Sequence, residues 1–232
     1  MSQMARTPAR LPVTVSDLDA LVAGTHPDPH DVLGAHAHDG GVTVRTLRPM
    51  ASSVTVRTDG GATPLEHEHG GVWVGVLDQS DLGDYRLDVA YDDGHPRSTD
   101  DPYRYLPTVG EMDQHLINEG RHEELWTVLG SHVRSYDAPG GPVTGTSFAV
   151  WAPNARGVRV AGDFNDWDAR AHPMRRLGSS GVWELFIPAV AGGARYKYEV
   201  LGAHGGWQQR ADPMARHTQT PPEWASVVFE SA

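Results

Sequence analysis

The sequence has no cysteine, and its only lysine is Lys197. Without cysteine the chain can form no disulfide, thiolate nucleophile or thiolate zinc site. No apolar run approaches the roughly 18 residues that a membrane-spanning helix needs. The two arginines near the N-terminus are not followed by the apolar stretch of a secretory signal. These absences predict a cytoplasmic protein that does not associate with membranes.

Basic residues are scarce in general. The 232 residues include 19 basic and 30 acidic ones, which give a net charge of −11. Residues 1–115 hold 8 basic and 18 acidic residues, and residues 116–232 hold 11 and 12. Neither half has the basic excess that binding to a phosphate backbone requires, so nucleic acid is not an expected partner.

Most of the chain alternates between apolar and polar residues. In residues 85–91 and 196–200 every second residue is apolar or aromatic, as in a half-buried strand. The same reasoning predicts further strands at 42–48, 53–58, 72–77, 147–151, 157–162, 182–187 and 227–230. Turns rich in glycine and proline separate them, which is typical of antiparallel sandwiches. Helix is predicted after a capping box that begins at Ser16, with a stop at Gly24. Two further helical pieces are predicted within 110–129, at about 111–119 and about 122–129.

An internal repeat of about 100 residues runs through the sequence. The matched segments, in order, are 32–36 with 128–132, 49 with 153, 54–56 with 158–160, 72–73 with 182–183, 85–86 with 196–197, and 101–102 with 212–213. Chance can produce one such match but hardly an ordered set. The repeat predicts an all-β fold of two tandem immunoglobulin-like antiparallel β-sandwiches, over 16–109 and 130–232. A short helical linker over 110–129 joins them, and a disordered tail covers 1–15.

The second repeat contains residue types that suit a sugar ligand. A sugar ring has apolar C–H faces and a polar rim, so its binding site needs flat aromatic rings and hydrogen-bonding groups. Trp167 follows a predicted strand in a loop of turn-forming residues, and Lys197 and Trp207 add an ammonium and a second ring. The alternative is that both rings only pack, Trp167 beneath its own loop and Trp207 at a sheet end. From residue types alone, that alternative is the commoner arrangement.

Several motifs together resemble a known family. The segments are 148–155, 162–167, 181–184, 196–198, 211–213 and 221–222, and their combination is similar to a carbohydrate-binding module of family 48. A first repeat with the segment 26–34 precedes this module. Residues 16–231 as a whole therefore resemble the N-terminal part of bacterial glycogen branching enzymes.

The resemblance implies a glucan-binding site in the second repeat. Related modules hold glucan with a Trp after the Phe-Asn of the loop, a Lys on the Tyr-Lys strand and a Trp before the Asp-Pro, which match Trp167, Lys197 and Trp207. An Asn near the end of a related module aligns with about Ser226, so an amide partner is missing here. The counterparts in the first repeat are roughly Thr63, Arg86 and Pro96. Because these residues form no aromatic platform, the first repeat is predicted to be structural.

The resemblance also implies a parent reaction. Branching enzymes transfer a segment of α-1,4-glucan to a 6-hydroxyl and so create α-1,6 branches in glycogen synthesis. Their catalytic domain is a family 13 (β/α)8 barrel, normally in the same chain, which uses two carboxylates about 5 Å apart and needs about 250 residues. The present residues show no alternating βα pattern, so we expect no catalytic residue, no cofactor and no activity from them alone. The expected partners are that barrel and α-1,4-glucan, as glycogen or maltooligosaccharide.

Two alternatives to this interpretation stay open. One is the front part of a related debranching enzyme or trehalose-releasing hydrolase, although these usually lack the first repeat. The other is a non-enzymatic protein whose sandwiches serve only as interaction surfaces. Glucan binding separates that second alternative from the carbohydrate-binding interpretation.

Other candidate chemistry in the sequence is weak. Histidines gather in two places, at positions 26, 30, 36 and 38 and at 67 and 69. The last two alternate on a strand, which would place both rings on one face, but their spacing matches no zinc motif and no metal site is predicted. Asp166, Asp168 and Glu184 are carboxylates in one region, and we expect them to cap a turn and face solvent rather than catalyse. Phosphate-binding glycine patterns and a serine nucleophile elbow are missing.

Overall fold

The computed structural model describes residues 9–39, 41–80, 82–92, 94–138 and 140–230. In the first half the elements are α1 (Val15–Ala23), β1 (Gly34–His38), β2 (Gly41–Leu47), β3 (Ser53–Thr58), β4 (Gly61–Pro64), β5 (Glu66–His69), β6 (Val72–Leu77), β7 (Arg86–Ala90) and β8 (Arg97–Thr99). They continue with α2 (Glu111–Asn118), β9 (Gly130–Ala138), β10 (Gly141–Trp151), β11 (Gly157–Gly162), β12 (Arg175–Arg176), β13 (Val182–Pro188), β14 (Arg195–Leu201), β15 (Trp207–Arg210), β16 (His217–Thr218) and β17 (Ser226–Val227). Neither of these helices is long and apolar enough to cross a membrane.

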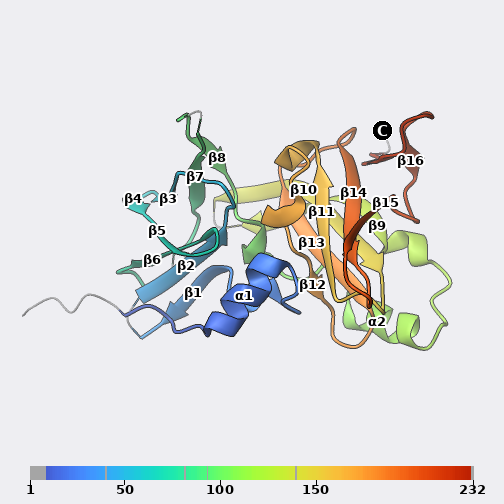
Figure 1. Cartoon of the computed structure of the whole chain (residues 1–232), viewed down its shortest axis with the longest axis horizontal. Coiled ribbons are helices and arrows are strands. Elements are labelled where there is room, and N and C mark those ends of the chain that lie inside the picture. The colour runs from blue at the N-terminus through green and yellow to red at the C-terminus, as the bar shows by residue number, and fades with distance from the viewer. Residues whose placement is uncertain (1–8, 40, 81, 93, 139, 231–232) are drawn as a thin grey trace, which may run out of the picture.

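The strands form two sandwiches, which lie side by side in Figure 1. In the first, the sheet β1-β2-β6-β5 faces the sheet β4-β3-β7-β8. In the second, β12-β13-β10-β9 faces β11-β14-β17-β16, and β15 pairs with the free part of β14. All strand pairs between these elements are antiparallel. The predicted all-β fold is confirmed.

Both sandwiches contain the same buried hydrogen bond between a tyrosine and an aspartate, at matching positions of the internal repeat. The hydroxyl of Tyr85 donates to the carboxylate of Asp101 at 2.8 Å, and that of Tyr196 donates to Asp212 at 2.5 Å. The other oxygen of each Asp accepts a backbone N–H two residues further along the chain. Burial raises the pKa of both carboxyls, and the phenol hydrogen bonds partly offset this effect. The two repeats therefore share a polar pair as well as a strand order.

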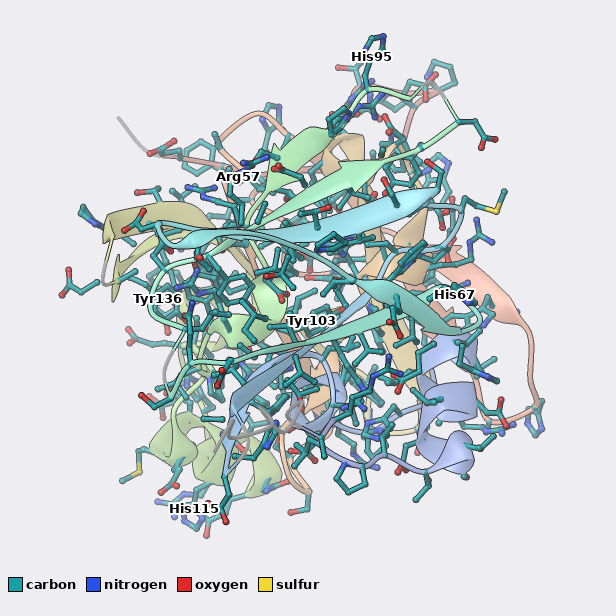
Figure 2. The ribbon with its side chains drawn as sticks, turned by 90° about the vertical axis from the view of Figure 1, so that its left-hand side faces the viewer. Arg57, His67, His95, Tyr103, His115 and Tyr136 are labelled. Atoms are coloured by element: carbon teal, nitrogen blue, oxygen red, sulfur yellow. The ribbon has the colours of Figure 1, made fainter. Side chains whose placement is uncertain are left out.

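The two sandwiches are not independent bodies, because one hydrophobic cluster joins them. Leu18 and Leu21 of α1 pack in the same cluster as Phe148 and Val158 of the second sandwich. Tyr103, which lies near the middle of the molecule in Figure 2, donates its hydroxyl to two backbone carbonyls of the second sandwich at 3.1 and 3.3 Å. Cutting the chain between the domains would expose this shared core to water.

Helix α1 begins slightly earlier than the sequence pattern predicts. Thr14 is its N-cap, and the Thr14 hydroxyl accepts the backbone N–H of Asp17 at 3.1 Å. The predicted cap, Ser16, lies inside the first turn. The predicted stop is confirmed, since Gly24 is the C-cap in the left-handed conformation, with φ of 72°.

The segment before α1 departs from the predicted disordered tail. The backbone N–H of Leu11 donates to the hydroxyl of Thr43 at 2.9 Å, and the guanidinium of Arg45 donates to the Leu11 carbonyl at 2.7 Å. These bonds fasten residues near position 11 to the outer face of β2, because that strand presents polar side chains there. The first eight residues of the predicted tail lie outside the described residues.

The linker covers the outer face of the second sandwich. Val109, Ile117, Leu125 and Leu129 pack there in one apolar cluster. The first predicted helical piece is α2, but the second, over 122–129, is wrong: it is only a 3-10 turn over Leu125–Thr127. In such a tight turn adjacent side chains diverge, so Leu125 packs inward while Trp126 is 53% exposed.

Candidate glucan-binding site

The loop after β11 presents Trp167 in a defined position. Asp166 and Trp167 both have positive φ, 51° and 62°, which is uncommon for residues with a side chain. The backbone N–H of Trp167 donates to the carbonyl of Gly162 at 3.0 Å, and its indole N–H donates to Asp163 at 3.2 Å. The side-chain oxygen of Asn165 accepts the N–H of Gly162 and closes the loop. The loop therefore fixes the ring at the end of β11.

An ion pair ties this loop to β14. The guanidinium of Arg195 makes two hydrogen bonds to the Asp163 carboxylate, at 2.8 and 2.9 Å, and the Arg195 backbone N–H adds a third. These donors hold the pKa of Asp163 below its usual range. Arg195 precedes Lys197 by two residues on the same strand, so the ion pair sets the loop beside the lysine.

Lys197 lies between two tryptophan rings on the outer face of the second sandwich. Its Nζ atom is 3.3 Å from the ring centre of Trp224 and 5.7 Å from that of Trp167. Burial lowers the pKa of Lys197, and the nearby carboxylate of Glu223 opposes that shift. The neighbouring Tyr side chains on β14 are buried, which confirms that Lys197 points away from their face. An ammonium over an aromatic face is a cation–π arrangement, favourable by about 0.5–1 kcal/mol at an exposed site.

Trp207 is not part of this cluster. It lies in β15 opposite the far end of β14, four residues from Lys197 along that strand, which corresponds to about 13 Å. The guanidinium of Arg159 covers its ring at 3.9 Å. On another side the ring meets Gly24, where an added Cβ would lie 2.9 Å from it. Trp207 thus packs against the end of α1 and helps to join the two sandwiches.

Trp224 is the aromatic residue that sequence reasoning missed. It is 47% exposed and follows the Pro221-Pro222 pair in the segment that leads to β17. The signal was its place two residues before Ser226, the position where the resemblance implied a ligand contact. Ser226 itself is fully buried, and its hydroxyl accepts the backbone N–H of Asp212 at 2.8 Å. It therefore offers no group to a ligand on the surface.

Among the residues that the structure describes, the first sandwich shows no comparable pair of tryptophan rings around a cation. Trp73, its single tryptophan, is buried and donates its indole N–H to the carbonyl of Arg48. Arg86, the counterpart of Lys197, extends toward the buried carboxylate of Asp100 at 4.0 Å. Within the described residues, the aromatic platform, which consists of the rings of Trp167 and Trp224 around Lys197, is thus a feature of the second repeat.

The two histidines on β5 contact different partners. A register shift separates His67 from His69, so the expected alternation is broken. His67 packs against the ring of Trp73 and accepts a backbone N–H, whereas His69 contacts Asp19 of α1. No group of three or more metal-ligating side chains occurs in the described part of the chain.

The three carboxylates lie in three different environments. Asp166 is exposed, and Asp168 caps a turn by accepting the backbone N–H of Arg170, as predicted. Glu184 is fully buried, so the expectation that it faces solvent is wrong. Its oxygens accept from Arg175 of β12 and from Thr108, which lies in the segment that leads into the linker.

Comparison with known proteins accounts for both halves of this fold. Residues 14–103 match the family model described as "alpha-1,4-glucan branching enzyme GlgB, N-terminal domain", and residues 128–215 match "Carbohydrate-binding module 48 (Isoamylase N-terminal domain)". The chain matches the N-terminal part of GlgB branching enzymes. The aromatic cluster thus lies on or beside the module 48 domain, with Trp224 just beyond the matched range.

Curated GlgB proteins are similar over nearly the whole chain. "1,4-alpha-glucan branching enzyme GlgB" of Frankia casuarinae is 59% identical over 218 residues, which is 93% of this chain and 27% of that protein. The GlgB of Thermobifida fusca is 60% identical over 94% of this chain and 29% of its own length. The chain therefore spans less than a third of these relatives.

Likeness to solved structures is more distant. A pullulanase from Anoxybacillus sp. LM18-11 aligns with 84% of this chain and 27% of its own, at 16% identity and a TM-score of 0.36. A likeness at that level carries no argument about function.

Proposed function

We propose that the second domain binds α-1,4-glucan, as glycogen or maltooligosaccharide, through Trp167, Lys197 and Trp224. The observation that carries the proposal is the position of the Lys197 ammonium between two tryptophan rings on the outer face of a module 48 domain. The rings offer apolar faces to sugar C–H groups, and the ammonium offers three donors to hydroxyls. The proposal replaces Trp207 of the sequence-based set with Trp224.

The expected affinity is low. The site is an open surface with two rings and one charged group, so it contacts a ligand from one side only. Such a site supports a dissociation constant on the order of 0.1–10 mM, or about −3 to −5.5 kcal/mol. Weak binding still localises a protein on glycogen, since one particle presents many chain ends and neighbouring sites raise the effective concentration.

Isothermal titration of the whole chain with maltoheptaose tests the assignment. Trp167→Ala and Trp224→Ala should each weaken binding at least tenfold, because a stacked ring contributes apolar area that no remaining group replaces. Trp126→Ala is the matched control, since Trp126 is about as exposed as Trp224 and also has a cation, that of Arg216, over its ring. Trp207→Ala should change stability more than affinity.

Three results would contradict the assignment. Unchanged affinity in both Trp167→Ala and Trp224→Ala would place the site elsewhere. A loss confined to Trp207→Ala would restore the set predicted from the sequence. If glucan does not bind the parent chain at all, the alternative of a non-enzymatic interaction protein gains support.

For the whole protein, we propose the reaction of its relatives: transfer of an α-1,4-glucan segment to a 6-hydroxyl in glycogen synthesis. The support is the match to GlgB sequences along nearly the whole chain. On this proposal the present residues hold glucan and dock a family 13 catalytic barrel, and the protein works in the cytoplasm. The match to the GlgB N-terminal domain favours this proposal over a debranching or trehalose-releasing hydrolase.

A further inference from the structure

A cleft lies between the two sandwiches, beside the loop that carries Trp167. Its volume is about 560 Å³, within the range of roughly 300–1,000 Å³ that small-molecule sites occupy. The first sandwich contributes Met50, Tyr91 and Arg97 to its lining, and the second contributes Asp166 and Asp168. The cleft therefore opens on the loop residues that flank Trp167 on both sides.

The lining combines apolar surface with hydrogen-bonding groups. Met50 is 70% exposed, and the half-buried Tyr91 adds an aromatic ring and a hydroxyl. Arg97 and Asp166 face each other from the two sandwiches, with 3.6 Å between guanidinium and carboxylate. Both side chains are well exposed, 61% and 88%, so a ligand in the cleft can reach the guanidinium and the carboxylate.

The charges of the cleft favour a neutral ligand. Arg97 from one wall faces Asp166 from the other, and Asp168 is paired with Arg170. Arg48 and Asp100, which also line the cleft, add one charge of each sign. Neither an anion nor a cation gains from such a balanced surface. A neutral polyhydroxyl compound does, because its hydroxyls can donate to carboxylates and accept from a guanidinium, while its C–H faces rest on apolar side chains.

We propose that this cleft is a second α-glucan subsite and that the first sandwich supplies Tyr91 and Arg97 to it. The inference rests on the proposed glucan binding at Trp167. Consecutive Cα atoms are about 3.8 Å apart, so the cleft residues Asp166 and Asp168 adjoin the Trp167 platform, and a glucan of several units can reach both. This role departs from the purely structural one that the sequence predicts for the first sandwich.

If the subsite exists, the effect of cleft variants on affinity should depend on the number of glucose units in the ligand. Tyr91→Leu and Arg97→Ala should weaken binding of maltoheptaose three- to tenfold and leave maltotriose binding unchanged, because the shorter ligand is held at the platform alone. Trp224→Ala should weaken the binding of both ligands. Arg57→Ala is the matched control: this arginine, labelled in Figure 2, is 59% exposed on the same sheet as Arg97 and does not line the cleft.

Each outcome of the titrations decides between the proposals. If both cleft variants bind maltoheptaose like the parent chain while Trp224→Ala does not, the subsite is wrong and the platform stands. If Trp224→Ala also binds like the parent, both proposals fail. Equal losses for maltotriose and maltoheptaose in Arg97→Ala would overturn the subsite and show that Arg97 only positions the loop through Asp166.

A second measurement keeps the test independent of how the variants fold. Amide chemical shifts of the parent chain are followed with maltoheptaose and with maltotriose. Shifts in residues 89–92 and 97–99 that occur with the longer ligand and not with the shorter one support the subsite. Shifts confined to the platform with both ligands overturn it.

Discussion

Acid should destabilise the protein through His172, which is buried beside the Trp167 loop. Its Nδ1 atom lies 2.9 Å from the amide nitrogen of Asn165, and its ring packs edge-on against Phe164. Burial lowers the pKa of His172 to about 3, and the positive charge of Arg48 acts in the same direction, against a smaller effect of Asp168. The neutral imidazole is therefore the form that fits the fold.

The sign and size of the effect follow from linkage. In the unfolded chain a histidine has a pKa of about 6.5, so between about pH 6.5 and pH 3 the unfolded state binds a proton that the folded state does not. The contribution of His172 to stability is complete above about pH 6.5 and decreases as the pH falls toward 3. At about 1.4 kcal/mol per pH unit, the loss between pH 6.5 and pH 4.5 is about 2–3 kcal/mol.

The assay is urea unfolding of the parent chain and of His172→Gln at four pH values between 7.5 and 4.5. The variant cannot titrate at this position, so its free energy of unfolding should decrease less steeply by about 1.4 kcal/mol per unit below pH 6.5. Burial also lowers the pKa of His30 and of His132, so only the difference between the two curves isolates His172. Parallel curves would refute the reasoning, and His217→Gln, at an exposed position in β16, is the control.

Two further changes test the packing. Glu184→Gln should cost about 3–5 kcal/mol in urea unfolding, because the buried guanidinium of Arg175 loses its counter-charge; a loss below about 1 kcal/mol would show that the pair is dispensable. Gly24→Ala should cost about 1–2 kcal/mol, because the left-handed cap is strained by a side chain and the new Cβ meets the ring of Trp207. Adding Trp207→Ala should recover part of that loss, and strictly additive losses would show that the two residues do not press on each other.

Local pattern and repetition determined the larger part of the fold. Period-two alternation shows which face of a strand is buried whatever lies opposite, which is why β3, β6 and β11 fall at the predicted residues. The ordered repeat implied two similar sandwiches, because segments of similar sequence pattern adopt similar folds. The proximity of Trp167 and Lys197 could also be predicted from the sequence. Trp167 follows β11, Lys197 lies on β14, and these two strands pair directly.

Only the tertiary structure decided which further ring completes the cluster. The sequence offers two exposed-looking tryptophans near the end of the second repeat. Trp207 packs against the end of α1, which lies about 180 residues earlier in the chain. Trp224 lies in the segment before β17, and its ring contacts the ammonium of Lys197. Neither contact has a local signature, because each depends on where a distant element docks.

The same limit applies to Glu184 and to the cleft. An acidic residue at an alternate strand position looks solvent-facing, yet the structure buries that face, and Thr108 and Arg175 donate to the carboxylate. The cleft exists because the shared hydrophobic cluster holds the two sandwiches together and sets their walls opposite each other. A pattern along the chain shows whether a side chain is apolar, polar or charged, and the packing of distant segments decides which neighbour covers it or bonds to it.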